Sequence, residues 1–143
     1  MKNVKIFSFN KIISKRNIHQ LVSKFSHLYG LQINFLEINI VTSNIVLELN
    51  RNYLNHNHRT DILTFNYSEN KSEIEGEIYI SFEDAQANSK RFSCSLDDEL
   101  KRLIVHGLLH LLGFQDNNTK QKKEMRIKED YLLKLSEKIT IIK

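Results

Sequence analysis

The absences in this chain narrow its class before any motif is considered. Proline is absent, and Cys94 is the single cysteine among 143 residues, so no disulfide can form within the chain. That cysteine usage fits a reducing cytoplasm, which is where we expect the protein to act. No apolar run is long enough to cross a membrane and no secretion signal is recognisable, so we expect no membrane partner.

The lone cysteine is not a convincing nucleophile. No histidine or acid stands at a recognisable spacing that would support catalysis by Cys94. We therefore expect its side chain to be a buried or half-buried filler, placed just before a helix that starts at Ser95.

Length and charge set wide bounds on fold and partner. A chain of 143 residues suits one domain, 1–143, with a core large enough to fold without disulfides. The formal net charge of +4 and the sequence pI near 9.1 favour polyanionic partners only mildly. Charge thus permits a nucleic-acid ligand without identifying one.

Hydrophobic periodicity predicts an α+β fold, with one roughly four-stranded mixed sheet and about five helices. We expect strands near 4–9, 33–41, 60–67 and 77–82. We expect helices near 18–29, 43–50 and 82–92, then a long one after Ser95 and a last one after Thr119. The polar segments 51–59 and 68–75 read as loops. His56 and His58 in the first loop could bind metal, face solvent or touch substrate.

The most informative stretch runs from His106 to Asp116. His106 and His110 are four residues apart, so they lie one above the other on a helix face. Gly113 then permits the helix to end and the chain to turn, which can bring Asp116 back toward the imidazoles. Two histidines on a helix and a third ligand from the next turn are how one zinc ion acquires three protein ligands and an open fourth position.

The surrounding helix supports a metal site. Residues 100–112 are apolar nearly all round, which is typical of a buried helix. One stripe is ionisable, at Glu99, Arg102, His106 and His110. Such groups on a buried helix must be paired or bound to something. The simpler alternative is that both imidazoles hydrogen-bond to neighbouring main chain.

The residue after the first histidine separates this motif from the metallopeptidase version. In H-E-x-x-H that position holds the glutamate that acts as general base. Here it is Gly107, which cannot accept a proton. A metallopeptidase is therefore disfavoured, although a bound metal could still polarise an acyl or phosphoryl oxygen.

The sequence HGLLHLLGFQD over 106–116 resembles the core motif of the YbeY family, metal-dependent endoribonucleases of bacterial ribosomal RNA maturation. The resemblance extends to Leu49-Asn50 with Tyr53, to TDILTF over 60–65, to GEI over 76–78, and to Glu124, Met125 and Glu129. It covers most of the chain. It implies one zinc ion bound by His106, His110 and Asp116.

Two positions depart from the family pattern. The usual third ligand of that family is histidine, and here it is Asp116, whose carboxylate is an acceptable zinc ligand that leaves the site less positive. An arginine that follows the tyrosine of the L-N-x-x-[FY] block, and is thought to contact RNA, is replaced by Leu54. Arg59 is the candidate to take over that contact.

The resemblance implies cleavage of single-stranded ribosomal RNA beside the small ribosomal subunit and its assembly factors. Lysine and arginine would then place the phosphodiester, and the candidates are Arg59, Lys120, Lys122, Lys123 and Arg126. The alternative for the cluster at 120–126 is a solvated helix face. Phe65, Tyr67 and Phe114 are the aromatic residues nearest the motifs, with core packing as the default for each.

The residues that would support the metal ligands can be assigned in more than one way from the sequence. Arg102 can contact phosphate or neutralise Glu99, and the i, i+3 spacing favours the ion pair. Ser81, Asp61 and Glu77 are candidates to orient the imidazoles. Two further functions stay open at this stage: a zinc metallopeptidase, and a ribosome-assembly factor whose metal is structural.

Overall fold

One mixed sheet organises the computed structural model, which describes residues 3–54 and 60–143. Its strands are β1 (Val4–Ser8), β2 (Gln32–Val41), β3 (Ile62–Asn66) and β4 (Glu73–Ser81), in the order β1-β2-β4-β3. β1 and β4 both run parallel to β2, and β3 runs antiparallel to β4. The predicted α+β class and the mixed four-stranded sheet are confirmed.

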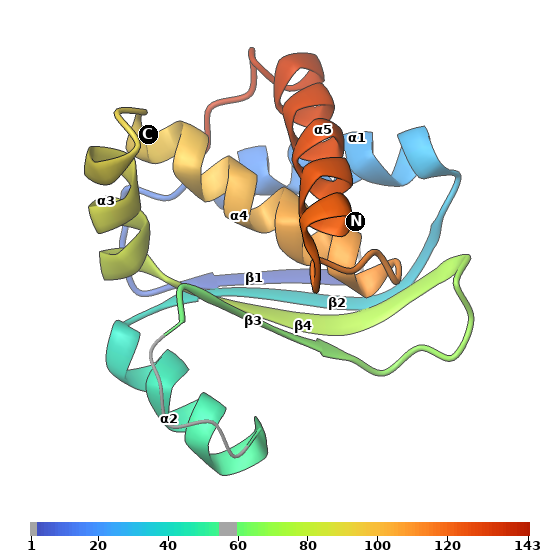
Figure 1. Cartoon of the computed structure of the whole chain (residues 1–143). Coiled ribbons are helices and arrows are strands. Elements are labelled where there is room, and N and C mark those ends of the chain that lie inside the picture. Colours follow the sequence, from blue (N-terminus) through green and yellow to red (C-terminus); the bar gives the residue numbers. More distant parts are fainter. Residues whose placement is uncertain (1–2, 55–59) are drawn as a thin grey trace.

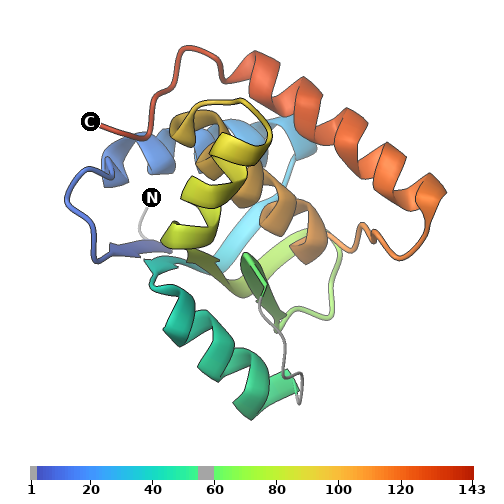
Figure 2. The same cartoon turned by 60° about the vertical axis from the view of Figure 1, so that its left-hand side comes forward.

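Five helices, as predicted, accompany the sheet within the described residues. They are α1 (Lys15–Tyr29), α2 (Ser43–Leu54), α3 (Phe82–Arg91), α4 (Leu96–Leu111) and α5 (Thr119–Leu135). Figure 1 shows α2 on one side of the sheet and α1, α4 and α5 on the other. In the turned view of Figure 2, α3 lies beside α4 while α2 stands apart. No helix in these described stretches is both long and apolar enough to cross a membrane.

The main core lies between the sheet and α1 and α4. Side chains alternate along β4, so that Ile74, Ile78 and Ile80 are fully buried while Glu75, Glu77 and Tyr79 are partly exposed. On α4 the apolar residues Leu100, Ile104 and Leu108 are fully buried against this layer. The buried helix that the sequence predicted is therefore the central helix of the fold.

Two glycines allow α4 to lie very close to the sheet. A Cβ atom at Gly107 would come within 3.0 Å of the Ile78 side chain and 3.1 Å of Ile62, and a Cβ at Gly76 would come within 2.7 Å of Leu111. A side chain at Gly76 would also collide with the Phe65 carbonyl oxygen, whereas one at Gly107 would require the two isoleucine side chains to shift by a few tenths of an ångström. Gly107 thus faces the sheet, and its lack of a side chain permits this close packing.

Local signals set the ends of the helices around the site. The Ser95 hydroxyl accepts a hydrogen bond from the Asp98 N–H at the start of α4, and Ser81 does the same for Asp84 in α3. After α4, Gly113 adopts a φ of 101°, which reverses the chain. Asn118 then caps α5 by accepting from the N–H of Gln121.

One helix and one strand are longer than the sequence predicted. α2 continues to Leu54 where the prediction stopped at residue 50, and β4 starts at Glu73, inside the segment predicted as a turn. Glu73 belongs to the strand because it pairs with Gln32 of β2. That pairing joins residues far apart in the sequence, so local polarity gave no sign of it.

The N-terminal end of α4 holds the chain that follows α5. Lys101 is only 2% exposed, lies 3.3 Å from the Asp97 carboxylate, and donates to the carbonyl oxygens of Ser136 and Ile139. Asp97 in turn accepts hydrogen bonds from the backbone N–H groups of Ile141 and Ile142. In this lysine clasp (Asp97, Lys101 and the main chain at 136–142), the ammonium group is bonded to oxygen atoms of the protein itself.

Candidate metal centre

Three of the predicted site residues come together at the C-terminal end of α4. The Nε2 atoms of His106 and His110 are 3.0 Å apart, and Asp116 Oδ2 lies 3.4 Å from the first and 3.3 Å from the second. One potential ligand atom from each of the three residues lies within 4.8 Å of the others. The turn at Gly113 is what returns Asp116 to the helix face.

These separations fit the edges of a zinc tetrahedron. Ligand bonds of about 2.0–2.1 Å place neighbouring ligand atoms about 3.3 Å apart in tetrahedral geometry. Two imidazole nitrogens and one carboxylate oxygen are also a donor set that zinc accepts. The three side chains are partly exposed, at 22%, 25% and 36%, so a fourth position would remain open to solvent.

A buried carboxylate from α5 orients one of the imidazoles. Glu129, 4% exposed, places Oε2 2.6 Å from His106 Nδ1, and its Oε1 accepts from the Arg102 guanidinium at 3.0 Å. Burial alone would lower the pKa of His106, but the hydrogen bond and charge of Glu129 raise it above the usual value. A proton held on Nδ1 leaves the Nε2 lone pair directed at the other two ligands.

This arrangement corrects the prediction about Arg102. Arg102 does not pair with Glu99; its partners are Glu129 and Asp130, the latter at 2.8 Å. The reason is that α5 crosses α4 at this point and supplies two acids to the guanidinium.

Of the three side chains proposed to orient the imidazoles, Asp61 accepts from the Asn88 amide, and its charge contributes to the raised pKa of His106. The other two have different partners. Ser81 caps α3, and Glu77 accepts from the Tyr79 hydroxyl. Glu129 was missed as the orienting residue, although a signal existed. It is an acid on the buried stripe of α5, between Met125 and Leu132.

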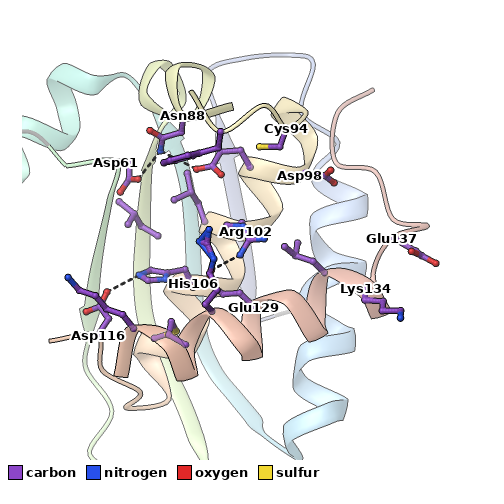
Figure 3. A pocket seen from close by; sticks show the side chains of 18 residues that line it. Asp61, Asn88, Cys94, Asp98, Arg102, His106, Asp116, Glu129, Lys134 and Glu137 are labelled. Atoms are coloured by element: carbon purple, nitrogen blue, oxygen red, sulfur yellow. Dashed lines mark hydrogen bonds and ion pairs between the residues drawn. The ribbon is translucent and has the colours of Figure 1, made fainter. Parts of the chain in front are cut away.

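A pocket of about 720 Å³ opens beside these residues. Figure 3 shows Asp116 toward one end of it, with Asn88 and Cys94 toward the other. Its walls come from α3, α4, α5 and the start of β3, and His106 and Asp116 line it together. Cys94 was expected to be buried or half-buried and is instead exposed, because α3 ends just before it and leaves it at the pocket wall.

The predicted RNA-contacting residues divide into three groups. Lys122 and Arg126 line the pocket. Lys120 and Lys123 are exposed on α5 and do not line it. Arg59 lies outside the described residues, as do His56 and His58.

The aromatic residues considered from sequence lie elsewhere. The ring centroids of Phe65 and of Tyr53 in α2 are 6.1 Å apart, which places Phe65 on the α2 side of the sheet. Tyr67, two residues further on, lies on the same side. Phe114 sits under the Lys128 ammonium, 4.9 Å from the ring centroid. Among described residues, the aromatic side chain that does line the pocket is Phe92.

A second polar group lines the same pocket away from the metal ligands. The Asn88 amide nitrogen donates to Asp61 Oδ2 at 2.9 Å and to Glu99 Oε2 at 3.1 Å. Glu99 is 4% exposed, and burial raises the pKa of its carboxyl above the usual value although the Asn88 hydrogen bond opposes this. The ionisable stripe of α4 thus continues from the candidate metal centre into this group.

The fold and the site together define an α+β protein whose central helix carries a candidate metal centre at the end of a polar pocket. The chain belongs to the YbeY endoribonuclease family, because the family model described as endoribonuclease YbeY matches residues 3–137. Membership of this family gives no support to a metallopeptidase.

Individual relatives agree with the family assignment. An endoribonuclease YbeY of Cytophaga hutchinsonii is 43% identical over 104 residues, which cover 71% of this chain and 73% of the relative. One of Bacteroides thetaiotaomicron is 32% identical over 121 residues, covering 85% and 88%. A solution structure of a Thermotoga maritima protein matches with a TM-score of 0.64 over 94% of this chain and 92% of that one; at 21% identity it supports the fold alone.

Proposed function

We propose that this protein, acting as one domain over residues 1–143, is a zinc-dependent endoribonuclease that cleaves single-stranded ribosomal RNA. The observation that carries the proposal is the convergence of His106, His110 and Asp116, with ligand atoms within 4.8 Å of one another, at the end of a pocket. Family membership supplies the reaction class.

A single zinc ion, when bound, supplies a Lewis acid that polarises a phosphoryl oxygen and lowers the pKa of water. The protein's own contribution is orientation. Glu129 holds the proton of His106 on Nδ1, and Arg102 fixes the position of Glu129 through the second carboxylate oxygen. These two contacts keep the His106 imidazole in the tautomer and orientation in which Nε2 can bind a metal ion.

Cationic side chains on α5 are suited to hold the RNA backbone. Lys122 and Arg126 line the pocket, so they are the proposed contacts to the phosphates nearest the reacting bond. Lys120 and Lys123, exposed outside the pocket, are proposed to contact RNA farther along the strand. Arg59 is proposed on the family resemblance alone.

Partners and compartment follow from the same resemblance. We propose that the substrate is presented near the small ribosomal subunit and its assembly factors in the cytoplasm. The expected specificity for single strands rests on the same resemblance. A single strand can also splay its bases away from the backbone and into a pocket, which the paired bases of a duplex cannot do.

The test combines metal content with cleavage of RNA. The purified protein is assayed on an end-labelled single-stranded RNA and on its duplex, before and after chelation, and again after zinc is returned. We expect about one zinc per chain, cleavage of the single strand only, loss of cleavage with chelator and recovery with zinc. Circular dichroism before and after chelation separates a catalytic metal from a structural one: a chain that unfolds on chelation would support the assembly-factor alternative.

A further inference from the structure

The half of the pocket away from the metal ligands contains side chains that zinc binding does not use. Asn88, Phe92 and Glu99, called here the distal subsite, line the same cavity as His106 and Asp116. The cavity, at about 720 Å³, is much larger than a phosphate and a metal ion require, and it lies within the range of about 300–1,000 Å³ typical of small-molecule sites. The distal subsite therefore has room for a further part of the substrate.

Phe92 presents an aromatic ring to this space. It follows the last turn of α3, where its N–H bonds the Asn88 carbonyl, and it is 59% exposed. Packing does not explain a phenylalanine that is mostly exposed. The Arg91 guanidinium lies 5.6 Å from the ring centroid, which places positive charge beside an aromatic face. Proteins that bind single-stranded nucleic acid stack bases on such rings.

The polar members of the subsite offer acceptors. Asn88 uses its amide nitrogen, which carries two hydrogens, to donate to both Asp61 and Glu99. The group's remaining capacity is in oxygens: the Asn88 amide oxygen and the second oxygens of the two carboxyl groups. Oxygen acceptors match a base edge that carries an amino group. Adenine, cytosine and guanine have one, and uracil does not.

The opposite wall carries the charge that a strand of RNA needs. Lys122, Arg126 and Lys134 of α5 line the pocket, together with Glu129, which is paired with Arg102, and with Glu137 just after the helix. The distal subsite lies on α4, on α3 and at the residue that follows α3. A strand bound with its phosphates toward α5 turns its bases toward α3. The acids on that wall repel phosphates, so this is the orientation that the charges favour.

We propose that the distal subsite binds one nucleobase of a single-stranded RNA, next to the phosphodiester at the zinc ligands. The base stacks on Phe92, and its amino group donates to the oxygens of Asn88 and Glu99. This rests on the proposed function, since it takes RNA as the ligand. It adds a base preference, amino-bearing bases over uracil, which the metal centre cannot supply.

The stacking contact can be observed directly because the chain contains no tryptophan. Phe92→Trp introduces one emitter into the subsite, and Phe7→Trp introduces one on β1, at a position that is 49% exposed and does not line the pocket. The ligands are 2′-O-methyl hexamers of adenylate and of uridylate, confirmed intact by gel after each titration. We expect the adenylate hexamer to quench Phe92→Trp emission and to leave Phe7→Trp unchanged. An abasic hexamer should quench neither.

Affinity of the same hexamers, measured by fluorescence anisotropy, gives the second readout. Phe92→Ala should weaken adenylate binding by about 5- to 100-fold, the usual effect of losing one stacked base. Phe92→Tyr should restore it, and Phe7→Ala should match the unmodified protein. Asn88→Ala should reduce the preference for adenylate over uridylate.

The outcomes separate this inference from the proposed function. If the unmodified protein binds and cleaves RNA, but Phe92→Ala binds adenylate equally well and Phe92→Trp emission does not change, the subsite is refuted and the endoribonuclease proposal stands. If the unmodified protein binds neither hexamer and cleaves no RNA, the proposed function itself is overturned.

Discussion

Both ends of α4 carry ionisable side chains that are fully or mostly buried, yet the two ends are built differently. At the N-terminal end, Lys101 is satisfied by Asp97 and by main-chain carbonyl oxygens, and the chain after α5 closes over it. At the C-terminal end, His106 and His110 have their Nε2 atoms turned toward each other and toward Asp116, next to an open pocket. Buried charge alone does not distinguish the two ends.

What distinguishes them is whether the donors and acceptors balance. The lysine clasp pairs one ammonium group with oxygen acceptors, so its hydrogen bonds are complete without a ligand. The histidine end collects three electron-pair donors within a few ångströms, and such a set is completed by a cation. The comparison predicts that damage at one end affects function and damage at the other affects stability.

The largest effect is expected from His110→Ala. Loss of a ligand should reduce zinc binding and slow RNA cleavage by at least about 100-fold, because metal polarisation contributes several kcal/mol to such reactions. Thermal unfolding is measured in parallel, because the His110 side chain is only 25% exposed and its removal also affects packing; cleavage is then compared per folded molecule. His27→Ala, at an exposed histidine of α1, is the control. Cleavage by His110→Ala within twofold of the unmodified rate would show that His110 is not a ligand.

The opposite end is tested with Lys101→Met. The change leaves Asp97 without its buried partner and two carbonyl oxygens without a donor, so the free energy of unfolding should fall by about 3 kcal/mol. Urea denaturation measures this. Asp98→Asn, which alters an exposed acid 3.7 Å from the same ammonium, should cost under about 1 kcal/mol. A loss of RNA cleavage per folded molecule in Lys101→Met would break the proposed separation between the two ends.

A smaller effect is expected where α5 supports the histidine end. Glu129→Gln removes the charge behind His106 Nδ1 and should weaken zinc binding by about 10- to 100-fold. Competition against a chromophoric chelator measures the affinity without any RNA. Asp130→Asn is the matched control, because Asp130 pairs with Arg102 and has no contact with His106 in the described structure. Equal losses in the two variants would mean that the Arg102 ion pairs matter more than the orientation of His106.

The smallest effect should come from Glu99, which lies in the first turn of α4 but faces the pocket. Burial raises the pKa of this carboxyl above its usual 4.5, so the folded state keeps its proton to higher pH than the unfolded state. Its contribution to stability is therefore complete below pH 4.5 and declines as pH rises toward the folded-state pKa. Glu99→Gln cannot titrate. Its unfolding free energy relative to the unmodified protein should rise with pH in urea titrations, and a constant difference would contradict the shift.

How much the sequence reveals depends on how far apart the cooperating residues are. His106, His110 and Asp116 lie within eleven residues, and helix geometry with one glycine turn was enough to predict that they meet. The strands and helices followed from periodicity in the same way. Glu129 is 23 residues from His106, and its role depends on where α5 crosses α4, which no local pattern encodes.

Phe92 lines the pocket, but nothing in the sequence around it predicted this. Its neighbours in sequence indicate only the end of a helix, and the aromatic residues close to the motifs were considered instead. Phe65 and Tyr67 are near the motif residues in sequence but lie on the α2 side of the sheet, because side chains alternate along a strand. Within the same block, Asp61 and Ile62 do line the pocket, so proximity in sequence identified some residues of this strand region correctly and others not.

The close approach of α4 to the sheet limits how this scaffold can diversify. At Gly107, the position that carries the general base in zinc peptidases, any side chain would be driven against Ile62 and Ile78. Adding that glutamate would press its side chain into the tight contact between α4 and the sheet, so the isoleucine side chains beneath the helix would have to shift to accommodate it. A change toward peptide hydrolysis would therefore involve the core beneath the helix as well as the new residue.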